Sequence, residues 1–121
     1  SSNTELEELY CSSNQLTSLD LSKNTKLAIL NCSFNKLTSL NVTHNKELFS
    51  LFCYVNKISG SNMTTLVNSL PDRTGKDSGS FYVFFRNSDD ENVITAAQAA
   101  VAKGKNWSVR DNNGNPYPPG S

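Results

Sequence analysis

The chain has 121 residues and no net charge, because eleven Lys and Arg residues balance eleven Asp and Glu residues. This length suits one domain with a hydrophobic core of its own. The neutral charge balance indicates no nucleic-acid partner. The apolar runs are far shorter than the ~20 residues of a membrane-spanning helix, so we expect no membrane insertion. The many Asn, Ser and Thr residues favour an extracellular or cell-surface protein.

The first half of the chain repeats itself every 21 residues. Self-similarity at such a period is typical of a solenoid, in which each repeat forms one turn and stacks on its neighbours. We therefore interpret residues 1–58 as successive turns of 21 residues. The columns that recur in all three repeats are Leu9, Leu30 and Leu51; Cys11, Cys32 and Cys53; Asn14, Asn35 and Asn56; and Leu16, Leu37 and Ile58.

Each repeat contains the pattern L-x-C, which predicts a short strand whose Leu and Cys point inward. Stacked turns place these strands parallel and in register, ~4.8 Å apart. The Asn three residues after each Cys lies where the chain bends away from the strand. Its amide can satisfy backbone groups of its own turn and of the neighbouring turn, so Asn14, Asn35 and Asn56 are predicted to be structural.

The three cysteines are predicted to form a ladder of buried, reduced thiols, because free Cys behaves as a small hydrophobe. Cys11, Cys32 and Cys53 share one inward column. In-register parallel neighbours do not readily supply the perpendicular dihedral of a disulfide, and three is an odd number. A zinc site would need closely spaced Cys or converging His residues, but the only histidine, His44, lies in another column. We expect no metal and no cofactor.

The unit L-x-C-x-x-N followed by LTSLDLSKNT (residues 16–25) resembles the cysteine-ladder class of bacterial leucine-rich repeats. Internalin-type surface proteins and many surface or secreted proteins of gut bacteria carry such repeats. The resemblance covers residues 6 to about 58. It implies a right-handed, curved solenoid whose strand face binds a partner, and it supplies no catalytic residues.

After residue 58 the 21-residue period is lost, and longer elements are predicted. Met63, Leu66, Val67 and Leu70 form one apolar helical stripe. An aromatic and β-branched segment predicts a strand, and an alanine-rich segment with acidic residues before it predicts a second helix. We interpret residues 59–121 as a C-terminal cap that continues the same solenoid. The predicted elements of this cap are a helix at 62–70, a strand at 81–86, a helix at 92–103 and a strand at 107–110.

The sequence thus predicts an α/β solenoid with one parallel sheet of about five strands. We expect the last two strands to follow the spacing of the first three, with Asn112 as the ladder asparagine of the last turn. The expected neighbours of Leu51 and Cys53 are Val83 and Phe85, followed by Trp107 and Val109.

Aromatic and arginine side chains gather at the outward positions of this sheet, and such residues are enriched in binding hot spots. The candidate partner-binding residues are Tyr10, Phe52, Tyr54, Tyr82, Phe84, Arg86 and Arg110.

Two functional hypotheses follow from this surface. In the first, the protein is a non-enzymatic interaction module that binds a protein or carbohydrate partner through the strand face. In the second, it is a structural spacer or a capping fragment of a longer surface protein, with no ligand of its own. Self-association through the uncapped N-terminal edge is a further option, because terminal repeats normally need a cap. No convergent set of titratable groups indicates an enzyme.

Overall fold

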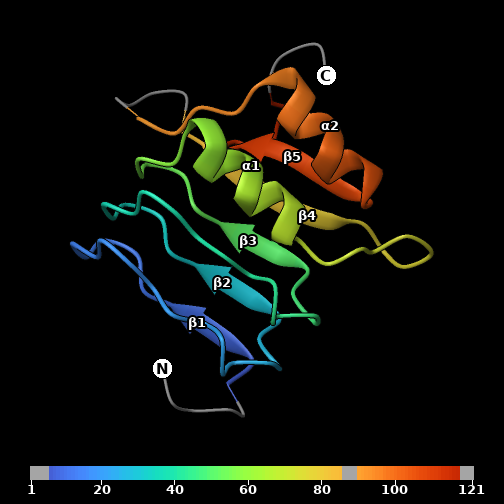
Figure 1. Cartoon of the computed structure of the whole chain (residues 1–121), viewed down its shortest axis with the longest axis horizontal. Helices are drawn as coiled ribbons and strands as arrows, with labels where there is room; N and C mark the ends of the chain where they lie inside the picture. The colour runs from blue at the N-terminus through green and yellow to red at the C-terminus, as the bar shows by residue number, and fades with distance from the viewer. Residues whose placement is uncertain (1–5, 86–89, 118–121) are drawn as a thin grey trace.

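The computed structural model describes residues 6–85 and 90–117. One parallel sheet runs through the molecule, and its strands are ordered β1-β2-β3-β4-β5, as in the chain. Figure 1 shows these strands stacked one above another, with the N-terminal turns at one end and the helices toward the other. The predicted α/β solenoid with one five-stranded parallel sheet is confirmed. The strands are β1 Glu8–Tyr10, β2 Ile29–Asn31, β3 Ser50–Phe52, β4 Gly79–Phe84 and β5 Trp107–Asp111.

The 21-residue period sets the register of the first three strands. Leu9 pairs with Leu30, and Leu30 pairs with Leu51, so residues 21 apart lie side by side. Leu30 and Leu51 are fully buried, whereas Leu9 in the first turn is half-buried. Each inward column therefore becomes a continuous line of core side chains.

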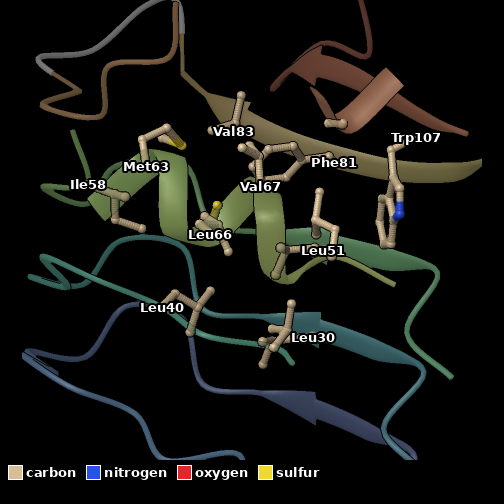
Figure 2. Close-up of a cluster of buried hydrophobic side chains, with 14 of the residues drawn as sticks. Leu30, Leu40, Leu51, Ile58, Met63, Leu66, Val67, Phe81, Val83 and Trp107 are labelled. Atoms are coloured by element: carbon tan, nitrogen blue, oxygen red, sulfur yellow. The ribbon is translucent and has the colours of Figure 1, made fainter. Parts of the chain in front are cut away.

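Two helices complete the core at the C-terminal end. Helix α1 spans Gly60–Ser69 and helix α2 spans Ala96–Gly104. The predicted apolar stripe of α1 is buried, and Figure 2 shows it in the same cluster as Leu51 and Phe81 of the sheet. α1 ends at Ser69, one residue short of the predicted end, because Pro71 cannot continue the helix.

The predicted helix at 92–103 begins four residues late, at Ala96. Thr95 is its N-cap: the Thr95 side chain accepts from the Gln98 backbone N–H, and the Gln98 side chain accepts from the Thr95 N–H. This reciprocal arrangement is a capping box. Asn92 precedes it in extended chain, because its side chain is buried in the asparagine ladder.

The asparagine ladder joins each turn to the one before it. The Asn56 side chain donates to the carbonyl oxygen of Cys53 in its own turn (2.9 Å) and to that of Cys32 in the preceding turn (3.1 Å). Its Oδ1 accepts from the Leu37 N–H at 3.0 Å. Asn35 makes the equivalent three contacts one turn earlier.

Asn92 continues this ladder in the fourth turn. It donates to the carbonyl oxygens of Cys53 (2.8 Å) and Val83 (2.9 Å) and accepts from the Ile58 N–H (2.9 Å). Val83 therefore takes the place that Cys53 holds one turn earlier. The ladder asparagine follows Val83 by nine residues rather than three, and residues 86–89 of this insertion lie outside the described structure.

The expected pairing of the last two strands is wrong by an even number of residues. Leu51 pairs with Phe81 rather than with Val83, and Phe81 pairs with Val109. β4 accordingly spans 79–84 instead of 81–86, and β5 extends to Asp111. An even shift keeps the side chains within the strands on their predicted faces, so Phe81, Val83, Trp107 and Val109 are all buried. Phe85, expected inward beside Cys53, is only half-buried, because it lies just beyond the end of β4.

The Trp107 ring fixes this register, because it needs the space over Gly79. A Cβ at Gly79 would lie 2.6 Å from two atoms of the indole ring. The indole N–H of Trp107 donates to the Pro71 carbonyl oxygen at 2.8 Å, which holds the ring in place.

Asn112, predicted as the ladder residue of the last turn, has a different role. Its backbone N–H donates to the Phe84 carbonyl oxygen. The buried Asp111 carboxylate accepts from the N–H groups of Asn113 and Asn115, at 2.8 and 3.0 Å. The chain thereby turns back along the outer edge of β5, where the Tyr117 N–H donates to the Val109 carbonyl oxygen.

Replacing Asn56 with Ala tests the ladder. The change leaves one buried N–H and two buried carbonyl groups without their partner, at ~1–3 kcal/mol for each unsatisfied group. We expect the free energy of unfolding to fall by about 3 kcal/mol or more in urea denaturation. Asn14→Ala is the matched control, because Asn14 is exposed and its side chain donates to the carbonyl oxygens of Cys11 and Ser12 in its own turn. Equal losses for the two variants would contradict the interpretation.

Replacing Gly79 with Ala tests the register. The added methyl group collides with the Trp107 ring, and such overpacking costs ~1–3 kcal/mol. We expect a corresponding fall in thermal and chemical stability together with altered Trp107 fluorescence. Gly104→Ala is the control, since a Cβ there meets no atom within 4 Å. A stable Gly79→Ala protein with unchanged fluorescence would refute the pairing.

Candidate functional site on the strand face

One outward column crosses all five strands at their solvent-facing side. The pairing of the strands places its members side by side, and we call this set the strand-face column. Its members are Tyr10, Asn31, Phe52, Tyr82 and Arg110. The sequence expectation set Phe84 beside Phe52, which is wrong because the register of β4 is shifted by two residues.

Phe52 and Tyr82 form the centre of the strand-face column. Their rings stack with centroids 4.3 Å apart and an interplanar angle of 0°. This separation is close to the strand spacing, so the rings stand upright on the sheet and cover each other's faces. Both side chains are half-buried. The pair therefore presents ring edges to the solvent.

The ends of the column are polar or exposed. Tyr10 is 62% exposed, and its hydroxyl donates to Glu8 Oε1 at 3.2 Å. Asn31 separates Tyr10 from Phe52, so Tyr10 does not touch the stacked pair through a neighbouring strand. At the other end, Arg110 Nη1 donates to the Gly114 carbonyl oxygen at 2.7 Å, which restrains its guanidinium.

Two of the candidate residues lie outside the column, near the carboxyl ends of the strands. Phe84 stacks on Tyr117 with centroids 4.6 Å apart and an interplanar angle of 7°. Tyr54 packs edge-on against Phe34, which the sequence reasoning missed, and against Phe85, which it had placed inward. Arg86, also a candidate, lies outside the described residues.

We call Phe34, Tyr54 and Phe85 the aromatic rim. Their centroids are 5.5–5.6 Å apart, and the interplanar angles are 87°, 71° and 61°. They come from three successive turns of the solenoid. The signal for Phe34 was present in the sequence, because this residue stands directly before a ladder asparagine, where the first turn has Ser13.

Asp90 ties the rim to the rest of the fold. Its Oδ2 accepts from the N–H groups of Val55 (2.7 Å) and Phe85 (2.9 Å), and its Oδ1 accepts from the Asn92 N–H at 2.9 Å. Burial raises the pKa of Asp90, while the donated backbone hydrogen bonds act to lower it. The carboxylate is thus turned inward, toward amides of two turns.

The three thiols line the interior behind the strand face. All three are free; Cys32 and Cys53 are buried, and Cys11 is half-buried in the first turn. Burial raises the pKa of each thiol. Within residues 6–85 and 90–117, no three His, Cys, Asp or Glu side chains converge as ligands for a metal ion. The described helices also lack the length and hydrophobicity needed to cross a bilayer.

Known proteins share both the repeat and the fold. The family of leucine-rich repeats (two copies) matches residues 4–47. A solved structure described as the functional domain of InlJ from Listeria monocytogenes, which includes a cysteine ladder, superposes with a TM-score of 0.57 at 25% sequence identity. The match covers 90% of this chain and 20% of that one, so this chain spans about a fifth of its length. No curated protein matches the chain in sequence.

Thiol labelling tests the burial of the ladder. A buried thiol with a raised pKa has little reactive thiolate and no contact with reagent. We therefore expect an aromatic disulfide reagent to label Cys11 slowly in the folded protein and to label all three cysteines in denaturant. The Cys11→Ser variant should show no labelling while folded. Rapid labelling of Cys32 or Cys53 at the rate of a model thiol would contradict the ladder.

Proposed function

We propose that this chain is an interaction module of the leucine-rich repeat, internalin-like kind, which binds a protein partner through its strand-face column. Folds of this kind are non-enzymatic scaffolds that generally mediate protein interactions. The internalin-type similarity also supports a location on a bacterial surface. In this proposal residues 59–121 cap the repeat turns of residues 1–58.

The stacked pair of Phe52 and Tyr82 is the observation that carries the proposal. Both side chains stand on the outward face of the sheet, where the repeat itself requires no aromatic residue: the same position in β2 is Asn31. Asn31 and Arg110 border the pair on either side. An aromatic centre with a polar border is the usual anatomy of a protein-binding hot spot.

The ring geometry favours a protein over a glycan. Sugar rings bind aromatic side chains through the ring faces. Phe52 and Tyr82 cover one face of each other, and Asn31 and Arg110 occupy the neighbouring strand positions on the opposite sides. Upright ring edges flanked by polar groups suit the side chains and backbone of a protein surface. The carbohydrate alternative therefore becomes an outcome of the experiment below.

The variant Phe52→Asn/Tyr82→Asn tests the proposal, because Asn is the natural residue of this column in β2. Wild type and variant are applied to an array of purified extracellular proteins and, in parallel, to a glycan array. We expect wild type to bind a protein on the array, and the variant to lose roughly tenfold or more in affinity, as for a hot spot. Melting temperatures should stay within a few degrees, about the shift that surface changes cause.

The matched control is Val101→Ser, a partly exposed apolar residue of α2 away from the strand face. It should bind as wild type does. Glycan binding that the double variant abolishes would replace the protein partner with a sugar. Absence of binding on both arrays would favour the spacer.

A further inference from the structure

Phe34 adopts a backbone conformation that phenylalanine rarely accepts. Its φ is +58°, in the left-handed region, and the equivalent residues Ser13 (φ 61°) and Val55 (φ 57°) share this conformation. The architecture of the turn imposes the left-handed backbone, at ~1–2 kcal/mol for a residue with a side chain. It does not impose an aromatic ring, because the first turn has Ser13 at this position.

The ring of Phe34 nevertheless remains 39% exposed. It meets Tyr54 and Phe85 edge-on rather than face to face. Mutual edge-to-face packing leaves part of each ring surface outward, unlike the stacked pair of the strand-face column. The aromatic rim therefore offers an apolar surface to solvent.

Asp90 fixes the rim before any partner arrives. Its carboxylate holds the N–H groups of Phe85 and of Val55, the residue after Tyr54. Two of the three rim rings are thus anchored through their own or adjacent backbone. A surface that needs little ordering on binding loses less conformational entropy.

A basic column lies next to the rim. Each ladder asparagine is followed by an exposed residue, and these residues share one column because the ladder stacks the turns. Its members are Gln15, Lys36, Lys57 and Val93. Lys36 follows Phe34 by two residues, and Lys36 and Lys57 occupy successive turns. Two ammonium groups on neighbouring turns repel each other, so a bound carboxylate would be favoured there.

We infer that the aromatic rim and the adjacent lysines Lys36 and Lys57 form a second contact surface, which binds an extended protein segment carrying an aromatic or aliphatic side chain flanked by carboxylates. The apolar side chain packs against Phe34 and Tyr54, and the carboxylates face the lysines. The Asp90 carboxylate accepts from three backbone amides and anchors the rim beside this surface. This surface goes beyond the strand-face column and shares no residue with it.

Selection of displayed random peptides on the whole chain tests the inference. We expect enriched peptides to combine an aromatic or large aliphatic residue with at least two Asp or Glu residues. Phe34→Ser should weaken their binding roughly tenfold or more, as for an aromatic hot spot. Lys36→Gln/Lys57→Gln should weaken it by a smaller factor and reduce its dependence on salt between about 50 and 500 mM.

Equivalent positions in other turns of the repeat show which substitutions the fold should tolerate. Phe34→Ser introduces the residue of the first turn, Ser13, and Tyr54→Ser introduces that of Ser12 and Ser33 in the same column. Both variants should bind the selected peptides more weakly, while their melting temperatures show that they are folded. Phe52→Asn should leave peptide binding unchanged, which separates this surface from the proposed strand-face site.

Four results would overturn the inference. The first is enrichment of peptides that lack acidic residues. The second is equal binding of the selected peptides to wild type and to folded Phe34→Ser or Tyr54→Ser. The third is absence of any enrichment over a parallel selection on Phe34→Ser. The fourth is binding of anionic glycans through Lys36 and Lys57 in place of peptides.

Discussion

The rest of the structure depends on the side-chain amides of the ladder asparagines, which join each coil to the coil before it. Without such a group, every bend after a strand would leave two carbonyls and one N–H buried without partners, because the chain turns inward there. Asn35, Asn56 and Asn92 each satisfy three of these groups, two of which belong to the preceding turn. The ladder therefore fixes the stacking of the turns, and the stacking fixes which side chains meet.

The sequence predicted the fold where spacing is constant and missed details where it is not. The 21-residue period determined the pairing of Leu9, Leu30 and Leu51, because one unchanged length closes each of those turns. In the fourth turn an insertion moves the asparagine from three residues after the inward Cys53 to nine residues after the equivalent Val83. Acidic residues before an alanine run then resemble a helix start, so Asn92 was assigned to the helix. The triplet Asn92-Val93-Ile94 repeats Asn56-Lys57-Ile58 and was the available signal.

For the candidate site, the sequence could predict only which strand side chains face outward, because side chains alternate along a strand. Alternation along a strand places Phe52, Tyr82 and Phe84 outward under either register, since the two registers differ by an even number of residues. Which rings touch depends on the register itself and on side-chain rotation, and neither is encoded in a repeat pattern. Phe52 therefore stacks on Tyr82 instead of Phe84, and Tyr54 turns toward Phe34 and Phe85.

A solenoid with such a ladder separates the residues that hold the fold from those that can change. Within the three 21-residue turns, inward columns keep Leu and Cys at equivalent positions, because a different volume there would disturb both neighbouring turns. Outward columns vary freely: Asn31 precedes Phe52, and Ser13 precedes Phe34. Aromatic rings could thus accumulate on the later turns without any change in the core. The same logic explains why the two proposed surfaces are independent, since each draws on an outward column whose substitution leaves the asparagine amides in place.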